Sequence, residues 1–195
     1  MALAVVLLVA GAAACGSEAP SGGASVTVPE SIPVHQGPRQ PLEGFQEVTV
    51  TITAPDGTTR QVCLLLADNA TTREQGLMFV TDLTLGGYDG MLFRFESEGS
   101  GGFWMKNTRI PLSIAYLASD GSIVSTADME PCPDGTERCP GYPPEGPYQY
   151  AVEVVQGRLD DIGLEGDARL TVGGNACTPV GATGTGSTAS PPAST

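Results

Sequence analysis

The 195-residue chain carries 22 acidic and 9 basic side chains, so its formal net charge is −13 with the single histidine, His35, neutral. This balance excludes a general nucleic-acid binder, because binding to a phosphate backbone needs clustered cations. One histidine in a proline-rich stretch also leaves little basis for a histidine-rich metal site or a Ser-His-Asp or Cys-His catalytic arrangement. Hydrophobic residues make up 41% of the chain, enough for one core.

The first 14 residues predict a signal peptide. They form an apolar run that is too short for a permanent transmembrane helix but suits the hydrophobic region of a secretory leader. Three alanines directly before Cys15, with glycine and serine after it, resemble a bacterial lipoprotein signal, in which Cys15 becomes the lipidated first residue. We therefore expect an extracytoplasmic protein anchored to the bacterial cell membrane by lipid on Cys15. The alternative is an ordinary secretory signal and a secreted protein.

The composition of the remaining chain predicts one folded domain with flexible ends. Residues 15–44 are rich in Ser, Gly, Ala and Pro without sustained periodicity, which is typical of a flexible tether. Residues 45–177 contain the patterned segments. Residues 178–195 are almost entirely Gly, Ser, Thr, Ala and Pro, and they cannot bury enough apolar surface to offset the entropy of ordering. We expect this tail to be disordered.

The pattern of short apolar segments separated by turn residues in residues 45–177 predicts an all-β domain with one or two short helices. Thr71 and Glu74 have the spacing of a capping box, and Gly76 would end the helical turns that follow. A short helix or turn is expected at residues 157–166. The strands are expected at residues 48–53, 59–67, 90–95, 103–107, 112–118, 122–127, 150–156 and 168–172. Short strands joined by Gly-rich and Pro-rich turns imply a compact β-sandwich or barrel.

The cysteines that remain after Cys15 predict two disulfides. Four cysteines are an even number in a chain that we expect to be exported, and they allow three pairings. Proximity in the sequence favours Cys132 with Cys139, which leaves Cys63 with Cys177. The alternative is a zinc ion held by all four thiolates, but the sequence has no pair with C-x2-C spacing.

Four sequence blocks, read in order, resemble the domain-of-unknown-function family 192 (DUF192). The blocks are residues 73–78 (REQGLM), 90–93 (GMLF), 103–108 (FWMKNT) with 110–112 (IPL), and 152–154 (VEV) with Gly157. The likeness covers about residues 45–173. It implies a compact β domain of jelly-roll or barrel type and almost nothing about chemistry. The family typically has Asp where this chain has Ser113, so any acid, base or ligand role of that Asp is lost here.

Residues in and near these blocks form a candidate binding surface: Arg73, Trp104, Lys106, Asn107 and Glu153. Glu153 lies among apolar neighbours in its predicted strand. Because an unpaired buried charge costs several kcal/mol, we hypothesise that Glu153 pairs with Lys106, Arg109 or Arg73. The alternative is a strand that faces the solvent, with both charges solvated.

Three methionines of the same blocks allow one metal hypothesis. Thioether sulfurs of Met78, Met91 and Met105 could bind Cu(I) in an exported protein. The alternative is that these side chains fill gaps in the core beside aromatic rings. No M-x2-M or M-x-M spacing concentrates the sulfurs, so core packing is favoured. We expect no cofactor and no other metal.

These observations favour a non-enzymatic, membrane-tethered extracytoplasmic domain that binds a small ligand or an envelope component. One alternative is an extracytoplasmic enzyme with Glu153 as acid or base and Lys106 or Arg73 as its charge partner. A second is a Met-based Cu(I)-binding protein, and a third is a domain that only makes protein contacts. Glu153 sealed in the core with a partner and with no adjoining pocket would favour the first function, whereas Glu153 at the bottom of a cleft with a raised pKa would favour the enzyme. Nothing in the sequence predicts the oligomeric state.

Overall fold

The computed structural model describes residues 28–177, with the exception of residues 30, 133–134, 137 and 175. The predicted signal peptide, Cys15, the first part of the predicted tether and the predicted tail therefore lie outside the described residues. Within the described part of the chain, no helix is long and apolar enough to cross a membrane.

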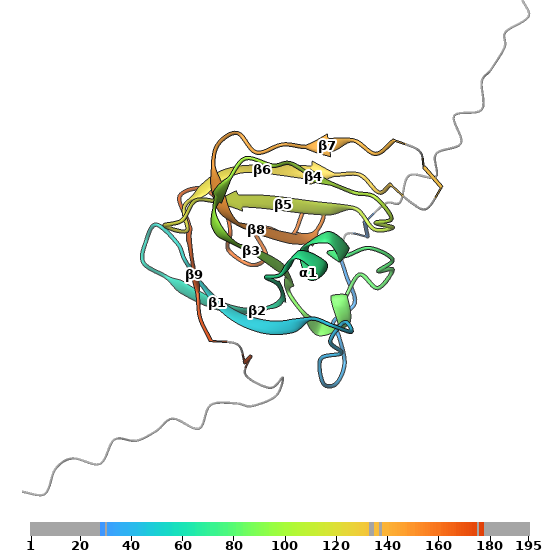
Figure 1. Ribbon diagram of the computed structural model, residues 1–195. Helices are drawn as coiled ribbons and strands as arrows, with labels where there is room; N and C mark the ends of the chain where they lie inside the picture. Colours follow the sequence, from blue (N-terminus) through green and yellow to red (C-terminus); the bar gives the residue numbers. More distant parts are fainter. Residues whose placement is uncertain (1–27, 30, 133–134, 137, 175, 178–195) are drawn as a thin grey trace, which may run out of the picture.

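The described residues form a β domain with very little helix, which confirms the predicted fold class (Figure 1). The one α-helix has six residues, and a single 3-10 turn follows it. In chain order the elements are β1 (Gln46–Thr53), β2 (Thr59–Ala67), α1 (Ala70–Gln75), η1 (Leu85–Gly87), β3 (Gly90–Gly99), β4 (Phe103–Trp104), β5 (Leu112–Leu117), β6 (Ile123–Met129), β7 (Gly141–Tyr142), β8 (Tyr148–Val155) and β9 (Arg169–Val172).

Seven strands form one mixed sheet in the order β6-β5-β8-β3-β2-β1-β9, and β4 and β7 form a second, two-stranded sheet. Among the strands of the described residues, only β2 and β3 pair in parallel. The large sheet curls until its two edges meet at one bridge, between Ser122 and Arg169. At that bridge the chain needs Gly121, because its φ is +79° and a Cβ would collide with the Leu170 carbonyl oxygen. The edges do not pair along their length, so the sheet is not a closed barrel.

Apolar side chains cover both faces of the large sheet and form two cores. Successive residues of a strand point to opposite faces, so Leu65 and Leu64, or Phe93 and Leu92, belong to different cores. One face carries Phe45, Tyr88, Phe93, Tyr116 and Tyr148 among its buried side chains, and we call it the aromatic core. The buried side chains of the other face are all aliphatic, and we call it the aliphatic core. Burial on both faces explains the unbroken apolar runs of β2 and β5.

Helix α1 begins two residues earlier than its sequence predicts. Asn69 is the N-cap: its Oδ1 accepts a hydrogen bond from the Thr72 N–H at 3.1 Å, and Thr72 Oγ1 accepts one from the Asn69 N–H at 3.2 Å. The capping box therefore joins Asn69 and Thr72 rather than Thr71 and Glu74, because β2 ends at Ala67 and the chain can turn at once. The predicted end of the helix is confirmed, since Gly76 is the C-cap with a φ of +48°.

The predicted strand at residues 103–107 is shorter in the structure. Strand β4 stops at Trp104, and the next residues form a turn in which the Thr108 N–H donates to the Met105 carbonyl at 2.9 Å. Asn107 has a φ of +58°, the left-handed region that asparagine tolerates better than most residues. Residues 157–166 form turns, which is one of the two structures predicted for this segment. Strand β7 was not predicted, because it lies in a proline-rich segment.

Part of the predicted tether lies on the domain. Ile32 and Leu42 are partly buried and pack against the aromatic core. The Gln40 N–H donates a hydrogen bond to the Gly86 carbonyl at 2.8 Å, which attaches this segment to the loop around η1.

The four described cysteines pair as their sequence proximity predicts. Cys63 and Cys177 form a disulfide with their Cα atoms 5.7 Å apart, which ties the last described residues to β2. Cys132 and Cys139 form the second, with a Cα separation of 5.8 Å, across a proline-rich loop. A sulfur held in a disulfide is not a thiolate, so the alternative of a four-thiolate zinc site does not apply to this structure.

Candidate functional site

A small pocket of about 30 Å³ brings together the candidate residues from separate parts of the chain. We call it the Glu153 pocket. Its lining consists of Arg73, Glu74, Gln75, Gly76, Leu77, Met78, Phe93, Phe103, Trp104, Lys106, Thr108 and Glu153. Four of the five residues of the predicted binding surface are in this lining. Asn107 is the exception.

Three elements place the lining around Glu153. In the middle of the large sheet, Glu153 on β8 pairs with Met91 of β3 on one side and Ile114 of β5 on the other. Its side chain projects from the face of the aromatic core, as the alternation along β8 predicts. Helix α1 and the turn after β4 cover that face, so their residues form the walls of the pocket.

The Glu153 carboxyl group is buried without a partner. The residue is 4% exposed. Within the described residues, no hydrogen bond or ion pair reaches the carboxyl group, and burial alone raises its pKa to about 8. Every side-chain oxygen in the buried part of the described chain has either a hydrogen-bond partner or some contact with solvent. Because the Glu153 oxygens have no partner, they must reach the pocket surface. The hypothesis of an ion pair with Lys106, Arg109 or Arg73 is therefore wrong for this structure.

Arg73 and Lys106 line the pocket but make other contacts. The Arg73 guanidinium lies 5.1 Å from the ring centroid of Phe95, and its Nη1 donates to the Arg94 carbonyl at 3.0 Å. The Lys106 ammonium lies 5.2 Å from the ring centroid of Trp104. Each cation lies against an aromatic ring, and neither is within ion-pair distance of the Glu153 carboxyl group.

Asn107 supports the wall of the pocket from outside its lining. The Asn107 Nδ2 donates to the Met78 sulfur at 3.8 Å, and its carbonyl accepts a hydrogen bond from the Phe79 N–H at 2.9 Å. Phe79 also has a positive φ, of 64°, which is unusual for a bulky side chain. Arg109 stacks on the Phe79 ring at 5.3 Å and is not part of the lining. The loop after α1 and the turn after β4, which both contribute residues to the lining, are thus joined directly.

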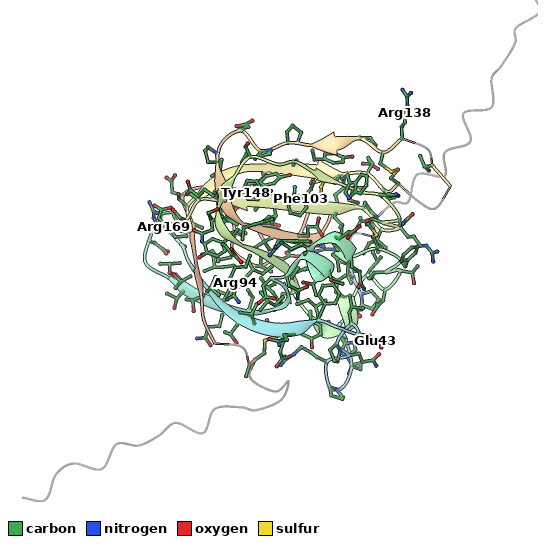
Figure 2. The ribbon with its side chains drawn as sticks, in the orientation of Figure 1. Glu43, Arg94, Phe103, Arg138, Tyr148 and Arg169 are labelled. Atoms are coloured by element: carbon green, nitrogen blue, oxygen red, sulfur yellow. A yellow bond between two sulfur atoms is a disulfide. The ribbon has the colours of Figure 1, made fainter. Side chains whose placement is uncertain are left out.

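A cluster of aromatic rings adjoins the pocket through Phe93 and Phe103, which are part of its lining. Phe103 meets Phe93 edge to face at a centroid distance of 4.8 Å, and Tyr116 meets Tyr148 at 4.9 Å. In Figure 2, Phe103 and Tyr148 lie close together on the same side of the sheet. These rings are largely buried, whereas Trp104 is 54% exposed at the rim. Sequence alternation could assign faces to Phe93 and Phe103, but it could not show that they enclose Glu153.

The methionines occupy different surroundings. Met91 and Met105 are 0% and 1% exposed and are packed in the aromatic core. Met78 is half-buried and lines the pocket. Core packing is therefore the role that the structure gives to Met91 and Met105.

Ser113, where the family typically has Asp, lies away from the Glu153 pocket. It is 2% exposed. Its hydroxyl donates to the Asp128 carboxylate, which lies opposite in β6, and accepts a hydrogen bond from the Gly157 N–H at 2.8 Å. The short serine thus joins β5 to β6 and to the turn after β8, and a carboxylate still lies beside it.

Comparisons with known proteins place this arrangement in a family. The chain is similar to a protein from Sinorhizobium meliloti 1021 described as a candidate transcription regulator, with 29% identity, 66% of this chain and 95% of that chain covered, and a TM-score of 0.53. It is also similar to a protein of unknown function from Novosphingobium aromaticivorans DSM 12444, with 28% identity, 71% and 94% covered, and a TM-score of 0.57. No curated protein matches the chain. The model of the family DUF192, described as "Uncharacterized ACR", matches residues 51–172, and the chain therefore belongs to this family.

Proposed function

We propose that this protein is a membrane-tethered extracytoplasmic domain that binds one polar group of a small ligand or envelope component in the Glu153 pocket. One observation carries the proposal: a carboxyl group that is almost fully buried, without a partner in the described chain, at the base of a pocket. Leaving a buried polar group without a partner costs free energy, so such a group favours a ligand that satisfies it.

The size of the pocket favours binding over catalysis. Pockets for whole small-molecule ligands usually measure about 300 to 1,000 Å³. The Glu153 pocket, at about 30 Å³, has room for one or two water-sized groups. A ligand would therefore insert only one small terminal group, and the rest of the ligand would lie on the surface beside the exposed ring of Trp104.

An enzyme is the second candidate, because Glu153 lies in a pocket, has a raised pKa and has no partner in the described chain, which is the arrangement expected of an enzyme rather than of a domain that only binds. A general acid or base near neutral pH needs a raised pKa, and burial raises the pKa of Glu153 to about 8. The carboxyl group also lies in a pocket whose walls include Arg73 and Lys106. A substrate would have to widen the pocket before its reacting atoms could reach Glu153.

The only tryptophan of the chain offers a direct test of binding. We expect at least one member of a panel of sugars and soluble cell-wall fragments to shift the emission of Trp104 and to raise the melting temperature. The matched variant Glu153→Leu, which fills the pocket without a carboxyl group, should not respond. If wild type and Glu153→Leu respond equally to the panel, or if neither responds, the result would count against the Glu153 pocket as a binding site.

The same ligand distinguishes a binding module from an enzyme. The compound that binds is incubated with wild-type protein and then analysed by mass spectrometry. If the domain only binds, the mass of the compound should be unchanged. A product that forms with wild type, and not with Glu153→Gln, would support the enzyme instead.

The tethering part of the proposal depends on Cys15. In a bacterial host, the full chain should fractionate with membranes and take up labelled fatty acid, whereas Cys15→Ser should do neither. Wild-type protein that lacks the label and stays in the cytoplasm would contradict tethering, and it would leave the pocket proposal intact.

A further inference from the structure

We propose that the group that enters the Glu153 pocket is a carboxylate, so that the ligand is a small molecule bearing a carboxylate near one end. This inference rests on the proposed function. It joins three features of the pocket: two cations in its walls on a chain that has few cations, the hydrogen-bond donors that these cations keep, and a carboxyl group at its base that can donate a hydrogen bond.

The first feature is the position of the cations. The chain has 9 basic residues against 22 acidic ones, and a surface of this charge repels anions in general. Two of the nine line one small pocket: Arg73 and Lys106, which is the only lysine of the sequence. Glu74 also lies in the lining, on an exposed position of α1, so the cations at the rim exceed the acidic groups there. This local excess favours a negatively charged ligand.

The second feature is the hydrogen-bonding capacity that these cations keep. Lys106 is exposed, and its ammonium rests over the Trp104 ring with three N–H donors. A guanidinium has five donors, of which Arg73 gives one to the Arg94 carbonyl. Both side chains can therefore donate to a carboxylate at the rim without breaking a buried contact.

The third feature is the protonation of Glu153. Its pKa of about 8 leaves the carboxyl group mostly neutral at pH 7, with an O–H that can donate to an acceptor. A ligand carboxylate is such an acceptor. An amine ligand, in contrast, would place its ammonium between Arg73 and Lys106.

The other groups that face Glu153 do not change this preference. From β3 these are the apolar side chains of Met91 and Phe93. From β5 these are Ile114, which pairs with Glu153, and Tyr116. Burial raises the pKa of Tyr116, so its hydroxyl stays neutral and donates to the Tyr142 carbonyl. The ionisable groups of the site are therefore those of the lining: Arg73, Glu74, Lys106 and Glu153.

Three fragments of similar size test the inference: acetate, acetamide and methylammonium. Binding to the full chain is followed by the emission of Trp104 and by the carboxyl ¹³C resonance of Glu153. We expect acetate to bind more tightly than the other two. Because it selects protonated Glu153, its Kd should rise about 30-fold between pH 6.5 and pH 9.5, as the carboxyl group ionises.

Charge variants test the role of the rim. Lys106→Met keeps the length of the side chain and should weaken acetate binding about tenfold, the size of one lost charge-assisted hydrogen bond. Lys106→Arg should retain most of the affinity. The control is Arg169→Gln, which removes a cation that is ion-paired with Asp120 at the edge of the sheet, on the far left in Figure 2. This variant should bind acetate as wild type does.

The outcomes separate this inference from the proposed function. Methylammonium binding that strengthens as pH rises through 8 would overturn the carboxylate assignment and keep Glu153 as a binding group. An acetate Kd that changes neither with pH nor in Lys106→Met would also overturn the carboxylate assignment. If no fragment perturbs Glu153 or Trp104, the carboxylate assignment fails, and the panel of sugars and cell-wall fragments decides the proposed function separately.

Discussion

Replacing Glu153 with glutamine should make the protein more stable at alkaline pH and leave its stability at pH 4 nearly unchanged. In the folded state burial raises the pKa of this carboxyl group from 4.5 to about 8. Below pH 4.5 the folded and unfolded states both hold the proton. Between pH 4.5 and 8 only the unfolded state releases it, so the free energy of unfolding falls as pH rises, and above pH 8 the loss is constant. The full loss is about 5 kcal/mol.

Urea unfolding of wild type and Glu153→Gln at pH values from 4 to 9 measures this loss. The difference between the two proteins isolates Glu153, because the other titrating groups are common to both. Glu96→Gln is the matched control, since Glu96 is an exposed carboxyl group on β3, and its curve should follow that of wild type. Parallel curves for wild type and Glu153→Gln over the whole range would show that Glu153 is ionised in the folded protein, and would contradict the buried neutral acid.

Alternation of apolar residues was enough to predict most of the large sheet. Val48, Val50 and Ile52 all belong to the aliphatic core, and a one-residue shift would have moved them to the other face. The strand that carries Glu153 was predicted by the same rule, with the correct face. Short segments were harder. Strands β4 and β7 have two residues each, and the pairing of distant chain segments decides their existence.

Most residues of the candidate site were predicted from the sequence, but the contacts between them were not. Arg73, Trp104, Lys106 and Glu153 converge because β8 lies in the middle of the sheet and α1 and the turn after β4 cover it. Sequence spacing does not show where a long cationic side chain will rest. Lys106 settles on its neighbour Trp104, a contact two residues away that competes with a pair to Glu153. Charge complementarity alone therefore predicted an ion pair that the structure lacks.

Removal of the disulfide between Cys63 and Cys177 should cost roughly 5 kcal/mol of stability, about twice the cost of removing the other bridge. A disulfide restricts the unfolded chain, and the restriction grows with the length of the closed loop. The bridge from Cys63 spans 114 residues of sequence, whereas the bridge between Cys132 and Cys139 spans 7. For the short loop the same relation gives roughly 2.5 kcal/mol.

The native structure adds to the difference between the two bridges. Cys177 is held near β1 by a hydrogen bond from its N–H to Glu47 Oε1 at 3.0 Å, and Thr49 donates to the Ala176 carbonyl at 2.9 Å. Without the covalent bond, the end of the domain keeps these contacts and the backbone hydrogen bonds of Thr49 with Gly173 and Gly174. Cys63 and Cys177 are each 9% exposed and pack against the aromatic core. Removing the two sulfurs also removes this buried contact.

Two double variants, Cys63→Ala with Cys177→Ala and Cys132→Ala with Cys139→Ala, provide a matched comparison by urea unfolding at pH 6. The long-loop variant should unfold at the lower urea concentration. Reductant should lower the midpoint of wild type to a value below that of either double variant, and it should leave a quadruple alanine variant unchanged. An equal cost for the two bridges would show that loop length does not set their contribution, and that native contacts around each sulfur pair decide it instead.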